Sequence, residues 1–525
     1  MLAHDYLDYY ATQYPSAPCV TLAAETLSYQ QFHQNVNRLA NGLRAKGIGK
    51  GDRVAILGRN SVEHGYALFA ASKIGAVLVS LNFRLAIDEL VYVLADADTR
   101  LLIVLDMQLS DMADTIHERM NARERMTGEV IVMGGAAFGD GEWRAWLAAQ
   151  DAANPKHVDL AADDELLQLY TSGTTGRPKG VVSNHHNLNA LMTMNNAALA
   201  YRPNPGDTVL LIAPLFHIGG AGSFMLSINA GQHILLHQEF VPDAVPQDLR
   251  AHSVASVFMV PAMIMALLNL PDVDAEPFPA LRQIYYGASP IAESVLLRAM
   301  QVFGAAFIQM YGMTESTGTV ATLSAQDHKR AVNGRTDLLL SCGRPCVGAR
   351  MQVVDSTGHP VPDGEVGEIC IASASVMNSY YQLPEETDKT LRNGWLHTGD
   401  AGYRDSEGYF YLKDRIKDMV VSGGENIYPA EVENVLSAMG AIQEVAVIGV
   451  PCQRFGEALM TIAVLHDGAS LSVEEMIAFC RGKIAGYKIP RQLSLLQSLP
   501  RNPSGKLLKT VLREPYWADE NRNIG

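Results

Sequence analysis

The sequence predicts an α/β protein with a large N-terminal domain of parallel or mixed sheets covered by helices, a β-rich subdomain, and a small α+β C-terminal domain. Short apolar runs alternate with helical patterns over most of the chain, which is typical of parallel sheets with helices on both faces. After about Gly343 the composition shifts to glycine- and proline-rich segments with short alternating strands. A length of 525 residues exceeds what one hydrophobic core organises, so several domains are expected.

The alternation of helix and strand patterns is clearest near the N-terminus. Apolar residues at helical spacing predict helices at 32–46, 63–74 and 89–95. Apolar runs between them predict strands at 54–57, 77–81 and 101–105. A further apolar run, Leu166 to Tyr170, predicts a strand that leads into a glycine-rich loop.

A charged junction, Asp414-Arg-Ile-Lys-Asp418, separates two apolar strand-like runs. After it we expect a helix beginning near Pro429, a strand at 444–450 and a helix at 472–480. The expected organisation is an N-terminal domain at 1–413, with its β-rich part from about 343, a hinge at 414–418, and a C-terminal domain at 419–525.

Composition and charge exclude some classes of partner. A formal charge of −15 argues against nucleic acid or an anionic membrane as the main partner, although a local basic pocket for phosphate stays possible. The N-terminal residues lack the pattern of a secretory signal, and no uncharged apolar run reaches the roughly 18–20 residues of a membrane span. Six scattered cysteines form no disulfide framework, and no His/Cys/Asp spacing indicates structural zinc. We therefore expect a cytoplasmic protein, and a homodimer is left open.

The segment YTSGTTGRPKGV, at 170–181, combines hydroxyl side chains, three glycines and two cations. Glycines let backbone N–H groups approach a polyphosphate, while hydroxyls and Lys179 add further donors and charge. The segment is not a Walker A motif, because Lys179 is followed by Gly180 and the glycine spacing differs. Taken alone, such a glycine cluster is better interpreted as a solvated Ser/Thr/Gly loop.

Four later segments carry side chains suited to a nucleotide. QMYGMTES, at 309–316, offers an aromatic face in Tyr311 and a carboxylate for Mg²⁺ in Glu315. GWLHTGD ends on Asp400, which suits ribose hydroxyls, and the following DRIKD supplies Arg415 for phosphate or ribose. PRNPSGKLLK places Lys506 in a Ser-Gly turn near the C-terminus. Each segment is weak alone, but their combination in this order is specific.

With these segments in this order, the chain from about Leu27 to Lys509 resembles the AMP-forming acyl-CoA synthetases (fatty-acid–CoA ligases) of the adenylate-forming superfamily. That superfamily also holds carrier-protein-loading adenylation domains and luciferases. The resemblance implies an ATP-dependent acid–CoA ligase of fatty-acid metabolism that uses ATP, Mg²⁺ and CoA. A carboxylate attacks the α-phosphorus of ATP, pyrophosphate leaves, and a thiol then displaces AMP from the acyl-adenylate.

The resemblance also assigns roles to individual residues. The β- and γ-phosphates would be held by Thr171, Ser172, Gly173, Thr174, Thr175 and Lys179. The rest of the nucleotide would be bound by Gly287, Ala288 and Ser289 with Tyr311 at adenine, by the adjoining Gly312 and Met313, and by Asp400 at ribose with Arg415 nearby. Thr314 would contact the α-phosphate, and Glu315 would bind Mg²⁺.

The family's small C-terminal domain is mobile and alternates between two positions. Lys506 would bridge the substrate carboxylate and the α-phosphate in the first step. Rotation about Lys417 would then bring Ser422, Gly423 and Gly424 to the pantetheine arm of CoA. By this hypothesis Lys417→Pro spares adenylation and slows thioester formation.

The acyl pocket is expected around His217, Gly219, Gly220, Tyr286 and Gly287. His217 gates this pocket by resemblance, although a core or turn histidine fits the sequence equally well. Small residues and the lack of Arg or Lys favour a bulky apolar monocarboxylate, such as a medium- or long-chain fatty acid or an alicyclic or aromatic acid. A stand-alone adenylation enzyme that loads a carrier protein and a nucleotide-binding regulator without catalysis stay as alternatives. A serine hydrolase is disfavoured, because G-x-S-x-G is missing.

Overall fold

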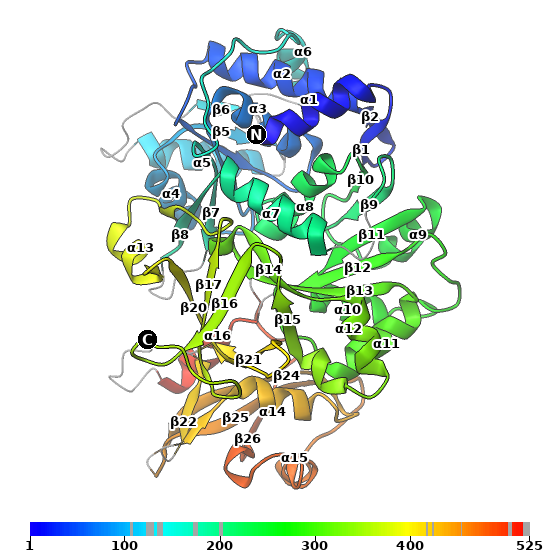
Figure 1. The fold of residues 1–525 in the computed structure, drawn as a ribbon, viewed down its shortest axis with the longest axis vertical. Helices are drawn as coiled ribbons and strands as arrows, with labels where there is room; N and C mark the ends of the chain where they lie inside the picture. The colour runs from blue at the N-terminus through cyan, green and yellow to red at the C-terminus, as the bar shows by residue number, and fades with distance from the viewer. Residues whose placement is uncertain are drawn as a thin grey trace.

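The computed structural model describes residues 1–105, 109–121, 131–133, 140–171, 177–198, 203–415, 418–422, 425–452, 454–501 and 507–517. Two large sheets with covering helices and a smaller C-terminal sheet make up the described fold (Figure 1). The predicted α/β class is confirmed. Within the described ranges, none of the helices combines the length and the apolar character that a membrane span needs.

The first large sheet has seven strands in the order β18-β8-β7-β4-β3-β5-β6. Its strands are β3 (Arg53–Leu57), β4 (Val77–Leu81), β5 (Thr99–Val104), β6 (Ile131–Met133), β7 (Glu165–Thr171), β8 (Lys179–Asn184) and β18 (Ser379–Tyr380). The strands from β6 to β7 are parallel, whereas β8 and β18 are antiparallel. All residues of β3 and β4 are buried, which explains their uninterrupted apolar patterns.

Seven helices accompany this first part of the chain. They are α1 (Ala3–Gln13), α2 (Tyr29–Ala45), α3 (Val62–Ile74), α4 (Ile87–Asp96), α5 (Ser110–Asn121), α6 (Asp140–Ala148) and α7 (His185–Ala198). Helix α2 begins three residues before the predicted start because a capping box forms at Ser28. The Ser28 hydroxyl accepts from the Gln31 amide at 3.2 Å, and the Gln31 side chain accepts from the Ser28 amide at 2.8 Å.

The second large sheet has 14 strands, in the order β16-β17-β20-β21-β15-β14-β13-β12-β11-β9-β10-β1-β2 with β19 beside β20. They are β1 (Pro18–Leu22), β2 (Glu25–Ser28), β9 (Thr208–Leu211), β10 (His233–Leu236), β11 (Val254–Met259), β12 (Gln283–Gly287), β13 (Ala306–Met313), β14 (Gly318–Leu323), β15 (Ser341–Pro345), β16 (Ala349–Val354), β17 (Gly367–Ser373), β19 (Leu391–Arg392), β20 (Trp395–Arg404) and β21 (Phe410–Arg415). Pairing is parallel from β1 to β13 and antiparallel from β14 onward. The β-rich segment after about residue 343 therefore continues the parallel sheet.

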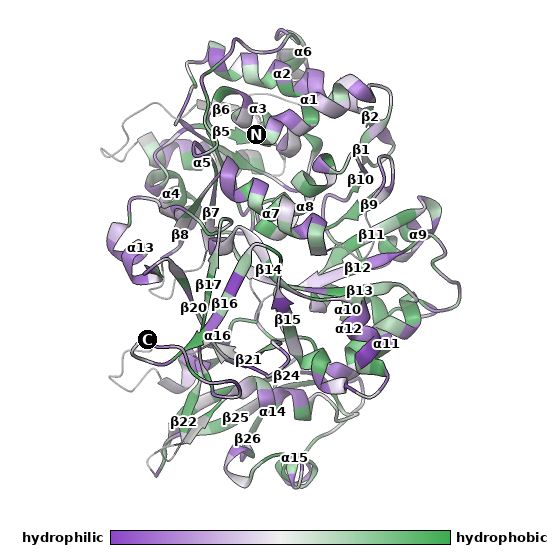
Figure 2. Ribbon diagram, viewed as in Figure 1, coloured by the Kyte–Doolittle hydropathy of each residue, from purple (hydrophilic) through white to green (hydrophobic). Residues whose placement is uncertain are grey.

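The helices that follow α7 in this part are α8 (Ile218–Asn229), α9 (Ala244–Ala251), α10 (Pro261–Leu268), α11 (Glu293–Phe303), α12 (Ala325–Val332) and α13 (Pro384–Thr390), with 3₁₀ turns η3 (Thr314–Ser316) and η4 (Thr336–Leu340). Figure 2 shows the hydrophobic colouring of the inner strands β9 and β11 and the hydrophilic colouring of α13. That contrast follows burial, since three of four β9 residues are buried and no residue of α13 is.

The C-terminal segment forms a five-stranded sheet with its own hydrophobic clusters. It contains β22 (Val420–Ser422), β23 (Glu425–Ile427), β24 (Ile442–Cys452), β25 (Gly456–Leu465) and β26 (Gln492–Leu495), with α14 (Pro429–Leu436), α15 (Val473–Cys480), α16 (Lys509–Trp517) and the 3₁₀ turn η6 (Gly486–Lys488). Ser472, at the predicted start of a helix, is the N-cap of α15, where its hydroxyl accepts from the Glu475 amide at 3.2 Å. This segment, orange to red in Figure 1, lies at the opposite end of the molecule from α2 and α6.

Candidate active site

A tight turn after β13 holds Glu315 in a buried position. Thr317 and Gly318 have left-handed φ angles of 52° and 111°, and the Ser316 hydroxyl closes the turn by donating to the Gly318 carbonyl at 2.6 Å. Gly312 is required here, since a Cβ atom on it would lie 1.9 Å from the Gly318 carbonyl oxygen. The sequence YGMTE therefore forms one closely packed unit.

The Glu315 carboxylate is bound by neutral hydroxyl groups. Its Oε1 accepts from the Tyr380 hydroxyl at 2.9 Å and from the Thr171 hydroxyl at 3.4 Å, and Glu315 is only 7% exposed. No lysine or arginine forms an ion pair with Glu315 among the residues that the structure describes. An anionic oxygen with neutral donors and no cationic partner fits a hard cation such as Mg²⁺.

Tyr311 and Asp400 form a second buried pair beside this turn. The Tyr311 hydroxyl donates to Asp400 Oδ2 at 2.7 Å, and the Thr398 hydroxyl accepts from the Asp400 amide at 3.0 Å. Burial raises the pKa of Tyr311 well above its ordinary value, and the Asp400 charge adds to that shift, so the phenol stays a donor. Asp400 pairs with Arg415 across β20 and β21. The predicted Tyr311, Asp400 and Arg415 are therefore neighbours.

The Gly287–Ser289 segment leaves β12 next to Met310. Gly287 pairs with Met310 in register, and a Cβ atom on Gly287 would lie 2.2 Å from the Met310 carbonyl oxygen. Ala288 follows in a left-handed conformation with φ of 69°, which is costly for a residue other than glycine. This turn lies at the carboxyl end of the parallel strands, where α/β sheets place ligands.

Lys179 lies at the start of β8 and is also buried. Its Nζ atom is 2.6 Å from Glu386 Oε2 and 4.9 Å from the centre of the Tyr380 ring. Hydrogen bonds from Lys179 and Lys389 lower the pKa of Glu386 to about 2. Tyr380 thus contacts both Lys179, through its ring, and Glu315, through its hydroxyl. Sequence reasoning missed Tyr380 and Glu386, which lie about 200 residues from the glycine-rich loop.

Several predicted residues lie outside the described part of the chain: Ser172, Gly173, Thr174 and Thr175 of the glycine-rich loop, Lys417 of the hinge, Gly423 and Gly424, and Lys506. Their neighbours are described. Thr171 and Lys179 flank the loop and pair with each other across β7 and β8. Ser422 lies in β22, where it pairs with Glu425.

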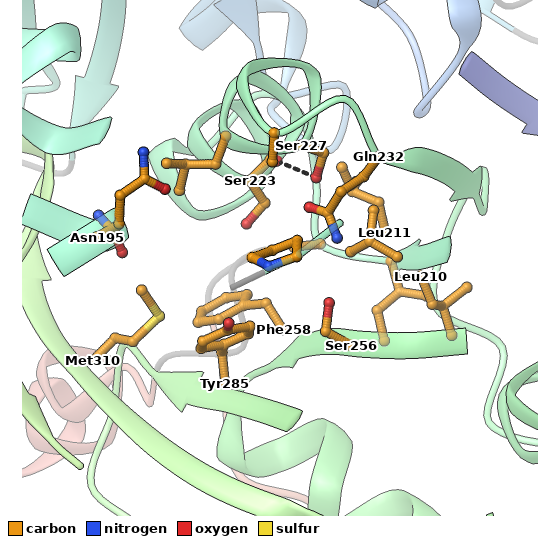
Figure 3. Close-up of a pocket in the computed structure, with 17 residues that line it drawn as sticks. Asn195, Leu210, Leu211, Ser223, Ser227, Gln232, Ser256, Phe258, Tyr285 and Met310 are labelled. Atoms are coloured by element: carbon orange, nitrogen blue, oxygen red, sulfur yellow. Dashed lines mark hydrogen bonds between the residues drawn. The ribbon is translucent and has the colours of Figure 1, made fainter. Parts of the chain in front are cut away.

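A cavity with about 700 Å³ of empty space, part of it open to solvent, lies between α8 and the strands β9, β11, β12 and β13 (Figure 3). Its wall is mostly apolar and includes Leu210, Leu211, Phe258, Tyr285 and Met310. Met310 precedes Tyr311 in the chain, so one end of the cavity adjoins the Tyr311–Asp400 pair. A volume of this size suits a bulky ligand.

None of the five residues predicted for the acyl pocket is among those that line this cavity. Tyr286 faces the other side of β12, where its hydroxyl is 2.8 Å from His328 Nε2, and Tyr285 lines the cavity instead, because successive strand residues face opposite sides. Gly220 packs against backbone, since a Cβ atom on it would lie 2.1 Å from the Pro214 carbonyl oxygen. Gly219 lies behind the wall, since a Cβ atom on it would be 3.3 Å from the ring of Phe258, which does line the cavity.

His217 is the N-cap residue of α8 and is not among the residues that line the cavity. The centre of its ring lies 4.6 Å from that of Phe216, and its Nε2 atom is buried with no hydrogen-bond partner in the part of the chain that the structure describes. Burial lowers the pKa of His217 to about 4, so the imidazole is neutral at pH 7. Its neighbour Ile218 lies 3.7 Å from the position of a Cβ atom on Gly318, next to the Glu315 turn.

A cluster of three metal-ligand types occurs on β17 and β20. Glu368, Cys370 and His397 place ligand atoms within 4.8 Å of one another, with Glu368 Oε2 and Cys370 Sγ at 2.7 and 3.4 Å from His397 Nδ1. Burial raises the pKa of the Cys370 thiol to about 12, which favours the protonated form over a thiolate ligand. The three groups satisfy one another by hydrogen bonds. Sequence spacing did not reveal the cluster, because strand pairing brings it together.

Family models match most of the chain. The model described as AMP-binding enzyme matches residues 7–381, and the AMP-binding enzyme C-terminal domain matches residues 431–506. The chain belongs to the AMP-binding enzyme family. The resemblance to adenylate-forming ligases found in the sequence is therefore confirmed, as is the assignment as an enzyme of the acid–thiol ligase class, which excludes the non-catalytic regulator.

Named relatives of this AMP-binding enzyme differ in their substrates. It is 38% identical over 520 residues to fatty acid–[acyl-carrier-protein] ligase ScoC of Streptomyces coeruleorubidus, covering 98% of this chain and 96% of the relative. It is 37% identical over 508 residues to feruloyl-CoA synthase of an Amycolatopsis species, covering 96% of each chain. The structure of ATP-bound MatB from Rhodopseudomonas palustris superposes with a TM-score of 0.89 at 28% identity, covering 99% of this chain and 100% of the other.

Proposed function

We propose that this AMP-binding enzyme is an ATP-dependent acid–CoA ligase that activates a bulky apolar monocarboxylic acid, such as a medium- or long-chain fatty acid or an aromatic acid. The observation that carries the proposal is the buried Glu315 carboxylate, which among the described residues is bound by the hydroxyls of Thr171 and Tyr380 and is adjacent to the Tyr311–Asp400 pair. This arrangement lies next to a largely apolar cavity of about 700 Å³, and the described residues of its wall include no lysine or arginine.

The first half-reaction joins the acid to AMP. An oxygen of the substrate carboxylate forms a bond to the α-phosphorus of ATP, and the bond from that phosphorus to the bridging oxygen breaks to release pyrophosphate. Thr171 and Lys179 bind the outer phosphates, Thr314 contacts the α-phosphate, and Asp400 accepts hydrogen bonds from ribose. Glu315 would hold Mg²⁺, and the bound ion would supply positive charge to the departing pyrophosphate.

The second half-reaction transfers the acyl group to the thiol of CoA. The sulfur attacks the acyl carbon, the carbon–oxygen bond to AMP breaks, and AMP leaves. Rotation of the C-terminal segment at 414–418 brings Ser422 and its neighbours to the thiol while it removes Lys506. The gap between the two family-model matches, residues 382–430, includes this junction.

The test is pyrophosphate release over a panel of acids from acetate to long-chain fatty acids, with aryl and steroid-like acids, with and without CoA. We expect release with bulky apolar acids and little with acetate or malonate, and AMP release that depends on CoA. Failure of every acid to release pyrophosphate overturns the proposal.

A second candidate is a ligase that loads a carrier protein, and the similarity to ScoC over nearly the full chain favours considering it. The first half-reaction is the same in both cases. AMP release with holo-carrier protein but not with CoA would establish this alternative.

A further inference from the structure

The amide of Gln232 is a buried donor inside the cavity. Gln232 lies between α8 and β10 and is 5% exposed, and its backbone is fixed because its amide donates to the Ser227 carbonyl at 3.0 Å. Its side-chain Nε2 is buried and has no hydrogen-bond partner among the described residues. A buried unpaired donor is costly, so its presence in a ligand cavity calls for a ligand partner.

The other polar side chains on the helical wall are already paired. The Ser227 hydroxyl donates to the Ser223 carbonyl at 2.8 Å, and the Ser223 hydroxyl donates to the Gly219 carbonyl at 2.6 Å. The Asn195 amide donates to the Leu191 carbonyl at 2.9 Å. These groups satisfy themselves within their own helices and need no ligand, unlike Gln232.

Figure 3 shows the side chains of Gln232 and Ser256 both directed into the cavity, from α8–β10 and from β11. Ser256 is 5% exposed and offers a hydroxyl that both donates and accepts. An amide and a hydroxyl at one end of an apolar cavity form a small polar patch.

The strand register gives the distance of this patch from the reacting end. Ser256 pairs with Gln283 at the start of β12, and Gly287, four residues further, pairs with Met310 beside Tyr311. Four residues of strand span roughly 13 Å. The polar patch therefore lies about 13 Å from the end of the cavity at Met310, a distance that an extended ligand can span.

We propose that the preferred substrate is an apolar carboxylic acid that carries a hydroxyl or other oxygen acceptor at its distal end, and that Gln232 with Ser256 determines this specificity. The inference rests on the proposed function, because it assumes that the cavity holds the acyl group. The distal oxygen accepts from Gln232 Nε2, which has no hydrogen-bond partner among the described residues. A plain fatty acid leaves that donor unsatisfied, and this difference sets the preference.

The experiment compares matched acids in ATP–pyrophosphate exchange. The pairs are phenylalkanoic acids of increasing arm length with and without a para-hydroxyl group, and straight-chain acids with and without a terminal hydroxyl. In the native enzyme we expect kcat/KM for the best oxygenated acid to exceed that of its partner by about tenfold or more. In Gln232→Leu the ratio should fall to about one, with a gain for the unsubstituted acid, because the unpaired donor is removed.

Ser227→Ala is the matched control, since its hydroxyl donates within α8 and the ratio should stay that of the native enzyme. Thermal unfolding verifies that each variant folds, and Gln232→Met replaces Gln232→Leu if the latter does not. A preference for unsubstituted acids in every pair, or the same ratio in the native enzyme and the Gln232 variant, overturns the inference and leaves the proposed function intact. If none of the acids tested supports ATP–pyrophosphate exchange, the proposed function itself is refuted.

Discussion

The Glu315 and Asp400 carboxylates have hydrogen-bond partners from the chain itself, whereas at the far end of the cavity the Gln232 side-chain nitrogen has none among the described residues. The Glu315 carboxylate has the hydroxyls of Thr171 and Tyr380, and Asp400 has that of Tyr311. These hydrogen bonds hold the Glu315 and Asp400 side chains in place before any ligand binds, and catalysis by electrostatic stabilisation requires such fixed groups. In the cavity, the unpaired Gln232 nitrogen gains a hydrogen bond only when the ligand carries an acceptor. On the inference above, this difference in binding free energy determines specificity.

We expect the largest loss of activity from a substitution of Lys506, which lies outside the described ranges. Lys506→Ala should lower acyl-adenylate formation about 10²–10³-fold, because a fixed positive charge at the crowded anionic centre is lost. Thioesterification of a supplied acyl-adenylate should fall far less. The two half-reactions are measured separately, and equal losses in both would contradict the role of Lys506.

Gly312→Ala tests whether the nucleotide side depends on its close packing. The added Cβ atom would lie 1.9 Å from the Gly318 carbonyl oxygen, so the turn that carries Glu315 must shift. We expect a loss of adenylation of about 10²-fold, as small displacements of catalytic groups produce. The control is Gly440→Ala, where no atom lies within 4 Å of the new Cβ. Normal pyrophosphate exchange in Gly312→Ala would show that the turn tolerates displacement.

Tyr380→Phe removes the hydroxyl that donates to Glu315 and keeps the aromatic ring, whose centre lies 4.9 Å from Lys179 Nζ. Since a buried carboxylate oxygen then loses its closest donor, we expect the Mg²⁺ concentration for half-maximal adenylation to change about tenfold. Tyr381→Phe is a matched control, because the Tyr381 hydroxyl donates to Asp98 at 3.1 Å instead. The measurement is a Mg²⁺ titration of pyrophosphate release, and identical titrations for both variants would separate Tyr380 from metal binding.

The last prediction concerns stability, and we expect it to affect activity least. Tyr286 and His328 form a buried hydrogen-bonded pair on the side of β12 that faces away from the cavity. His328 Nε2 accepts from the Tyr286 hydroxyl, and its Nδ1 donates to the Ser324 carbonyl at 2.8 Å. Burial lowers the pKa of His328 to about 4, so the unfolded chain takes up a proton first as the pH falls. The contribution to stability is complete above the unfolded pKa near 6.5 and is lost toward pH 4, by about 3 kcal/mol.

Denaturant unfolding of the native enzyme and of His328→Gln between pH 7 and pH 4 measures this contribution. The variant should lose less of its free energy of unfolding over that range, by up to the same amount. His252→Gln, at a histidine whose side chain is 43% exposed, is the control and should follow the native curve. Parallel curves for His328→Gln and the native enzyme would contradict the pKa shift.

The sequence predicted elements with strong local signals and missed features that depend on long-range pairing. Strand β4 occupies the predicted residues 77–81, since an apolar run between a helix and turn residues is a local pattern. By contrast, the continuity of β14 with β15 and the neighbours of Glu315 depend on strand pairing and distant contacts. Tyr285 lines the cavity and Tyr286 does not, because adjacent strand residues face opposite sides, and the sequence around 285–287 does not say which of them faces the cavity.

The family could be predicted from the sequence, because the motifs that carry the resemblance are short and contiguous, and the nucleotide roles of their residues stay predictions. Tyr380 and Gln232 could not be predicted, since a tyrosine in a loop or a glutamine before a strand carries no signal in one sequence. Their roles emerge only from what their atoms contact, or fail to contact, in the folded chain.

If Lys179 binds phosphate as proposed, its ion pair with Glu386 would make nucleotide entry an exchange of anions. On the proposed role of Lys179, an incoming triphosphate displaces a carboxylate that already neutralises the lysine, so the net gain in attraction is smaller than for a bare cation. After pyrophosphate forms, Glu386 returns to its former partner and competes with the product for the same ammonium group. The pair thereby weakens retention of a highly charged product and favours turnover.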